Sequence, residues 1–195
     1  MHLAIADESP LVRMAAASAL GASSADGVLA DLERLLVDED PRVGAAAVRG
    51  IGSYCAAGRT RDTDDRARAL ELLAGPLADG GVEGRGGAAM AALEALDAIG
   101  GPDAGRVAAT GLASDEPEVA QAAVGCVGRH GDGETLLELI PVVQHASWAV
   151  RGEAIQTLAE RRVAQALPAI LRRLETEQDS LVQDVIVRAL RRLEE

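Results

Sequence analysis

Apolar residues recur along the chain at helical spacing, in segments separated by short polar turns. In the first such segment Val12, Ala16 and Leu20 lie four positions apart, which places them on one stripe of an α-helix. Runs in which β-branched and polar residues alternate, as they do in strands, do not occur. The pattern therefore predicts an all-α protein, in which many small alanine side chains let neighbouring helices approach closely.

The segment of residues 7–21 (DESPLVRMAAASALG) is repeated along the chain. Residues 38–52 read DEDPRVGAAAVRGIG and residues 115–128 read DEPEVAQAAVGCVG, while weaker copies occupy residues 148–158 and 181–190. When the prolines of the three strong copies are superposed, four further positions coincide: Val12, Val43 and Val119; Ala16, Ala47 and Ala123; Leu20, Ile51 and Val127; Gly21, Gly52 and Gly128. Such self-similarity is typical of a protein built from stacked repeats.

Each copy carries signals for the beginning and the end of a helix. The acidic residue before the proline can cap the helix, and the proline fits the first turn, where its missing N–H is not needed. Gly21, Gly52 and Gly128 follow the last apolar residue, where we expect a left-handed C-terminal cap. Other amphipathic helices are predicted over residues 28–37 and 67–78. Because neither helix of a pair can bury its stripe alone, the sequence predicts stacked helical pairs.

The repeated string is D-x-x-P-x-V-R followed by alanines and A-L-G, carried in the first copy by Asp7, Pro10, Val12, Arg13, Ala16, Leu20 and Gly21. It resembles the HEAT repeat, and specifically the short HEAT-like subtype first associated with phycobilin lyases. The resemblance implies an all-α, right-handed α-α superhelix, or α-solenoid, of about five to six helical pairs. It also implies that the second helix of each pair lines the concave side.

One position of the repeat departs from the family pattern in most copies. The signature arginine is present at Arg13 and Arg151, whereas the same position is occupied elsewhere by Gly44, Ala120 and Gln183. Any ladder of aspartate–arginine pairs that runs between the repeats is therefore expected to be interrupted.

The resemblance covers nearly the whole chain, so we expect a single HEAT-like repeat domain over residues 1–195. Its approximate pairs are residues 1–21, 24–52, 63–100, 102–129, 132–161 and 163–195. The first pair is truncated, which predicts either a longer protein or an incomplete pair. The stripe around Val12 then loses part of its cover, and we expect this end to associate with a second copy or with upstream repeats. Residues 52–65 and 79–87 are predicted to be loops.

The composition narrows the classes of partner. The net charge is −12 and all 19 basic residues are arginine, whereas binding to a phosphate backbone requires a continuous basic stripe. We therefore expect no nucleic-acid partner. No apolar run approaches the ~20 residues of a membrane span, and the N-terminus lacks the features of a signal peptide, so we expect no membrane partner and a cytoplasmic location. A composition rich in alanine and glycine and free of lysine is typical of a high-GC bacterial genome.

The sequence contains no recognisable catalytic, metal-binding or cofactor-binding constellation, so we expect no cofactor and no enzymatic activity. His2, His130 and His145 lack the spacing of metal ligands, and the G-x-G-x-x-A string of residues 84–89 follows a predicted helix rather than a strand. The HEAT-like enzyme that hydroxylates a lysine-derived residue uses His-Glu pairs, which this chain lacks. Phycobilin lyases and HEAT-like DNA glycosylases use aromatic residues, and this chain has one Trp, one Tyr and no Phe.

These observations favour a non-enzymatic protein–protein interaction module or scaffold, because a curved repeat surface suits that role. One alternative is an accessory subunit of a lyase or other modifying enzyme. A second alternative is a nucleic-acid-binding or base-repair HEAT-like protein.

Trp148 stands where the stronger copies have proline, at the first turn of a predicted helix. Arg151 follows three residues later and Gln156 lies further along the same helix, so we predict that Trp148, Arg151 and His145 share one exposed edge. Tryptophan and arginine are frequent anchors of protein interfaces, which makes these four residues a predicted partner-binding patch. The alternative is that Trp148 fills a gap between repeats while Arg151 pairs with a nearby acid.

Overall fold

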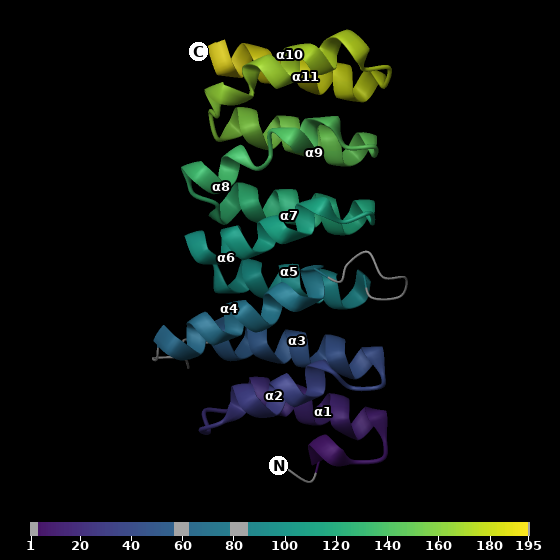
Figure 1. Cartoon of the computed structure of the whole chain (residues 1–195), viewed down its shortest axis with the longest axis vertical. Helices are drawn as coiled ribbons and strands as arrows, with labels where there is room; N and C mark the ends of the chain where they lie inside the picture. The colour runs from purple at the N-terminus through teal and green to yellow at the C-terminus, as the bar shows by residue number, and fades with distance from the viewer. Residues whose placement is uncertain (1–3, 57–62, 79–85, 195) are drawn as a thin grey trace. The chain divides into compact units, whose positions relative to one another are not determined.

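The computed structural model describes residues 4–56, 63–78 and 86–194. Within these residues the chain forms eleven α-helices and four short 3-10 helices, and no strand (Figure 1). The all-helical prediction is confirmed. The chain divides into two compact units, residues 1–100 and residues 101–195. The middle of the predicted loop 52–65 and most of the predicted loop 79–87 lie outside the described residues.

Unit 1 consists of stacked helical pairs preceded by a single helix. Its elements are η1 (Ala4–Ala6), α1 (Pro10–Gly21), α2 (Val28–Leu36), α3 (Pro41–Ala56), α4 (Thr63–Ala78) and α5 (Gly86–Ile99). Helix α2 packs on α3 and α4 packs on α5, and α1, α3 and α5 stack on one another in chain order. Helix α3 continues past the predicted end at Gly52, because Tyr54 and Cys55 in its last turn are buried.

Unit 2 repeats the arrangement with shorter first helices. Its elements are α6 (Pro102–Ala108), η2 (Ala109–Ala113), α7 (Pro117–His130), α8 (Gly133–Leu137), η3 (Pro141–Gln144), α9 (Trp148–Glu160), η4 (Ala164–Ala166), α10 (Leu167–Thr176) and α11 (Ser180–Glu194). The second helices α7, α9 and α11 stack on one another in chain order. Proline explains one interruption: α8 ends shortly before Pro141, which cannot donate the backbone hydrogen bond of a continuous helix.

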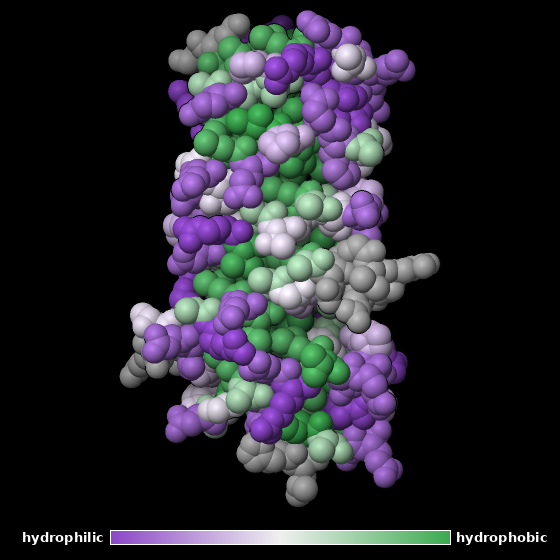
Figure 2. Space-filling model, in the orientation of Figure 1, coloured by the Kyte–Doolittle hydropathy of each residue, from purple (hydrophilic) through white to green (hydrophobic). Residues whose placement is uncertain are grey.

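The valine of the repeat is buried in the core in four of its five copies. Val43, Val119, Val150 and Val182 are at most 1% exposed, whereas Val12 is 39% exposed. Among the described residues only the short η1 lies before α1, whereas α3, α5, α7 and α11 each pack against the α-helix before them. Figure 2 shows apolar side chains gathered along the middle of the visible face of each unit, with polar side chains on both sides.

The prediction that Gly21, Gly52 and Gly128 are left-handed C-terminal caps is wrong. All three are helical, and they lie where two second helices approach closely. A Cβ atom at Gly21 would lie 2.7 Å from the carbonyl oxygen of Gly50, and one at Gly52 would lie 2.5 Å from the Cβ of Ala95. The repeated glycine is therefore a requirement of helix packing rather than of helix termination.

Candidate partner-binding surface

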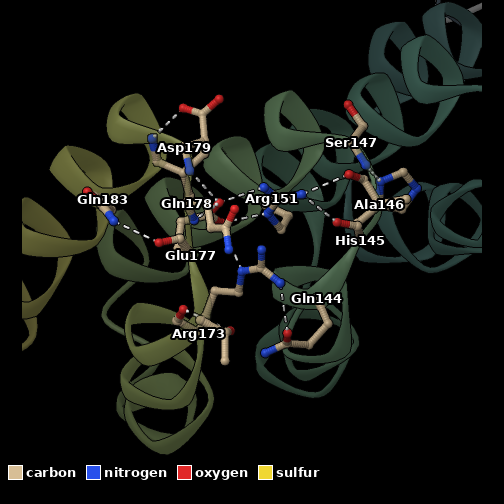
Figure 3. A network of polar contacts seen from close by, with 12 residues as sticks. Gln144, His145, Ala146, Ser147, Arg151, Arg173, Glu177, Gln178, Asp179 and Gln183 are labelled. Atoms are coloured by element: carbon tan, nitrogen blue, oxygen red, sulfur yellow. Dashed lines mark hydrogen bonds and ion pairs between the residues drawn. The ribbon is translucent and has the colours of Figure 1, made fainter.

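Arg151 on α9 is the centre of a polar network in unit 2 (Figure 3). Its Nε donates to Oε2 of Glu177 and its Nη2 donates to Oε1 of Glu177, each over 2.8 Å. Its Nη1 donates to the carbonyl oxygens of His145 at 2.9 Å and of Ala146 at 2.8 Å. The guanidinium thus links the turn before its own helix to the turn of the following repeat. Its contact with the Glu177 carboxylate is bidentate, with two parallel N–H···O hydrogen bonds.

Glu177, which lies between α10 and α11, accepts further hydrogen bonds. Arg173 Nε donates to Oε2 over 2.8 Å, and the backbone N–H groups of Gln178 and Asp179 donate to Oε1 over 3.0 Å. Burial alone would raise the pKa of this carboxyl group, but the hydrogen bonds from Arg151 and Arg173 outweigh burial and lower the pKa to about 2. Glu177 is therefore ionised at neutral pH, although it is buried.

Unit 1 contains the same arrangement at Arg13. Its Nε and Nη2 donate to the two carboxylate oxygens of Asp38 over 2.7 and 2.8 Å, and its Nη1 donates to the carbonyl oxygens of Asp7 and Glu8. The hydrogen bonds from the Arg13 guanidinium lower the pKa of Asp38. In each unit the arginine thus binds two carbonyl groups of its own turn and both carboxylate oxygens of one acid of the next repeat, and Arg13 also donates to Glu39 over 3.4 Å. We call this arrangement an arginine node.

The other copies carry different side chains at the arginine position. Gln183 keeps part of the arrangement, because its Nε2 donates to the carbonyl oxygen of Glu177 over 2.7 Å. Gly44 and Ala120 have no side chain that can donate a hydrogen bond. A ladder of ion pairs is therefore interrupted at Gly44, Ala120 and Gln183, and of these only Gln183 keeps a hydrogen bond to the turn.

The predicted exposed edge does not form as proposed. Trp148 is 51% exposed, but Arg151 is only 7% exposed and its guanidinium donates four hydrogen bonds within the arginine node. The prediction that Arg151 shares the exposed edge is therefore wrong, because the ion pair with Glu177 holds the side chain inward. His145 is half-buried, and its Nδ1 accepts a hydrogen bond from the backbone N–H of Ser147. The alternative is correct for Arg151, which pairs with an acid, whereas Trp148 keeps about half of its surface exposed.

Gln156 lies apart from Trp148 on the same helix. The two residues are eight positions apart, which corresponds to about 12 Å along a helix axis. Gln156 lines a groove between α9 and α11, with a volume of about 390 Å³. The other residues of this groove, which we call the α9–α11 groove, are Ala159, Glu160, Val185, Arg188, Ala189 and Arg192.

A family model for HEAT repeats matches residues 1–93 and 106–191. The chain belongs to the HEAT-repeat family. An engineered protein is similar in structure over 98% of this chain and 94% of its own, with 21% identity and a TM-score of 0.61. A designed armadillo repeat protein is similar over 96% and 95%, with 19% identity and a TM-score of 0.52. Human deoxyhypusine hydroxylase in complex with glycerol is similar over 97% and 82%, with 16% identity and a TM-score of 0.51.

These structural similarities show the fold alone, because the identities are low. No curated protein matches the chain. Among the described residues of this HEAT-repeat chain, no helix has both the length and the apolar character needed to cross a membrane.

Sequence reasoning placed Gln156 on the surface but missed the rest of the α9–α11 groove. Arg188 and Arg192 repeat at a spacing of four on α11, which places them on one side of the helix. The spacing of these two arginines is visible in the sequence. The sequence alone does not show that Gln156 and Glu160 of α9 line the same groove.

Proposed function

We propose that this HEAT-repeat chain is a non-enzymatic protein-interaction module and that its α9–α11 groove binds a segment of a partner protein. The observation that supports the proposal is the composition of the groove. Both helices are second helices of their pairs, which the resemblance to HEAT repeats assigns to the concave side, where repeat proteins present extended binding surfaces. The proposed partner is a polypeptide segment with both polar and apolar side chains.

The groove combines apolar contact with charges of both signs. Ala159, Val185 and Ala189 provide small apolar side chains, while Glu160, Arg188 and Arg192 provide charged groups. Interfaces that form and separate are about as apolar as an ordinary protein surface, with arginine enriched and a polar rim. The mixture in this groove suits such an interface.

The proposal is tested by affinity capture from the native host with the full chain as bait, followed by mass spectrometry. Arg188→Glu reverses one charge in the groove. Arg172→Glu, on the exposed side of α10, makes the same change outside it and serves as the matched control. We expect a protein that is captured by the wild-type chain and by the control but not by Arg188→Glu. A set of captured proteins that is the same for all three baits would overturn the assignment of the groove.

A further inference from the structure

Unit 1 contains a cavity of about 620 Å³ at the place where one arginine of the repeat is missing. It lies between the pair α2–α3 and the pair α4–α5, and it is lined by Gly44 together with Leu36, Asp38, Glu39, Val48 and Pro76 among others. Gly44 is the residue that corresponds to Arg13 and Arg151. The cavity therefore occupies the position that an arginine node fills in the other two copies.

The turn beside the cavity offers the acceptors that a guanidinium uses elsewhere in the chain. Three copies share one contact, in which the side chain at the arginine position donates to the carbonyl oxygen six residues earlier: Arg13 to Asp7, Arg151 to His145, and Gln183 to Glu177. The corresponding carbonyl for position 44 belongs to Asp38. Glycine at position 44 has no side chain to donate to it, and no described residue fills that role.

Asp38 and Glu177 also correspond in the use of their side chains. The carboxylate of Glu177 binds the arginine of the preceding repeat, while its carbonyl oxygen accepts from Gln183 of its own repeat. The carboxylate of Asp38 binds Arg13 in the same way. In the described part of unit 1, the carboxylate of Asp38 therefore has its arginine, but its carbonyl oxygen lacks the side-chain donor that Gln183 provides to Glu177.

The turn beside the cavity carries a net charge of −1, because Asp38, Glu39 and Asp40 are accompanied by only two arginines, Arg13 and Arg42. Glu39 lines the cavity with a side chain that is 87% exposed, and its ion pair with Arg13 spans 3.4 Å. Arg42 also lines it, but its guanidinium is held by both carboxylate oxygens of Asp40, so its charge is compensated locally. The remaining walls, formed by Leu36, Val48 and Pro76 among others, suit the methylene groups of an arginine side chain.

We infer that this cavity receives an arginine side chain supplied by the partner protein, whose guanidinium donates to the turn at Asp38 and Glu39 as this chain's own arginines donate to theirs. The inference rests on the proposed function, because it specifies the chemistry of the partner segment. It places this contact in unit 1, apart from the α9–α11 groove of unit 2.

The test is a titration of the full ¹⁵N-labelled chain with a short peptide, acetyl-Gly-Arg-Gly-amide, followed by NMR. We expect saturable shifts of the backbone amides around residues 38–45. The citrulline peptide has the same shape without the charge, and it should bind about tenfold more weakly, since hydrogen bonds to charged groups are roughly twice as strong as neutral ones. Equal binding of the two peptides, or no saturable shift at these residues, would overturn the inference.

A pair of variants provides a second measurement. Gly44→Arg supplies the missing arginine from the chain itself, whereas Gly44→Ala adds only a Cβ atom and is the control. The Cβ atom lies 3.2 Å from the carbonyl oxygen of Leu36 in both variants, so both have the same local contact. We expect Gly44→Arg to lose at least tenfold in affinity for the arginine peptide relative to Gly44→Ala. Equal affinities would contradict the inference. Because the titration needs no natural partner, its failure leaves the capture experiment on Arg188→Glu unaffected, and the two proposals fail separately.

Discussion

The arginine node at Glu177 makes the stability of unit 2 depend on one carboxylate. Glu177→Gln keeps the size and shape of the side chain but removes its charge. The buried guanidinium of Arg151 then loses its counter-ion, while its hydrogen bonds to His145 and Ala146 remain possible. Glu175→Gln removes a charge from an exposed glutamate two residues away and is the matched control.

The expected loss of stability follows from the geometry of this ion pair. Removal of one partner of a buried pair destabilises a protein by about 3–5 kcal/mol. Because the glutamine oxygen can still accept one of the hydrogen bonds, we expect the lower end, about 3 kcal/mol. For a chain of this length the melting temperature then falls by about 6–12 °C. Glu175→Gln should change the unfolding free energy by less than ~0.5 kcal/mol.

The difference between the wild type and Glu177→Gln should depend on pH with a definite sign. The pKa of Glu177 is about 2 in the folded chain and near its ordinary value of 4.5 in the unfolded chain. Its contribution is therefore fully present above about pH 4.5 and is lost as the pH falls through the folded pKa. The two unfolding free energies should converge between these values.

Urea denaturation provides the measurement, with far-UV circular dichroism for the whole chain. Fluorescence of Trp148, the only tryptophan, reports on unit 2. A difference below ~1 kcal/mol at neutral pH, or one that does not change between pH 4.5 and 2, would refute the assigned role of the ion pair.

Three further predictions concern single residues. Gly50→Ala should destabilise unit 1 by about 1–3 kcal/mol, because its Cβ would lie 2.8 Å from the carbonyl oxygen of Ala17. Gly152→Ala is the control, because its Cβ would meet nothing within 4 Å, and it should not destabilise the chain. Equal melting temperatures of the two variants would contradict the packing role of Gly50. Trp148→Ala should leave the melting temperature nearly unchanged, because the side chain is half-exposed. If Trp148 is an interface anchor, the same change should weaken partner binding by more than ~2 kcal/mol. A melting temperature that falls by several degrees without a loss of binding would exclude this role. If the face around Val12 associates, Ala19→Glu should reduce the molecular mass seen by light scattering, whereas a monomer before and after the change would refute association there.

The helical elements were predictable because they depend on local periodicity. The repeated valine and proline fixed the start and the buried stripe of each second helix, and the structure confirms the helical fold. The role of the repeated glycine was not predictable from one copy at a time. A glycine near the end of an apolar run suits both a cap and a close helix contact, and only the neighbouring helix, with Gly50 beside Gly21, distinguishes the two.

The predicted patch failed at Arg151 for a similar reason. Its partner Glu177 lies 26 residues away, and no sequence pattern distinguishes that acid from the many others in the chain. The position of Arg151 in the repeat did carry a signal, since Arg13 occupies the same place. The repeat position shared by the two arginines, where aspartate–arginine pairs are expected, indicated the buried role of Arg151 better than its nearness to Trp148 indicated an exposed one.

The uneven distribution of arginine nodes has a consequence for partial unfolding. In a repeat protein, stability is approximately a sum of terms for each repeat and for each boundary between neighbours. The Arg13–Asp38 and Arg151–Glu177 pairs strengthen the boundaries α1–α3 and α9–α11, while Gly44 and Ala120 leave their boundaries without such a pair. Amide hydrogen exchange should therefore show the slowest opening at the two strengthened boundaries, so that each unit separates into a persistent end and a part that opens more often.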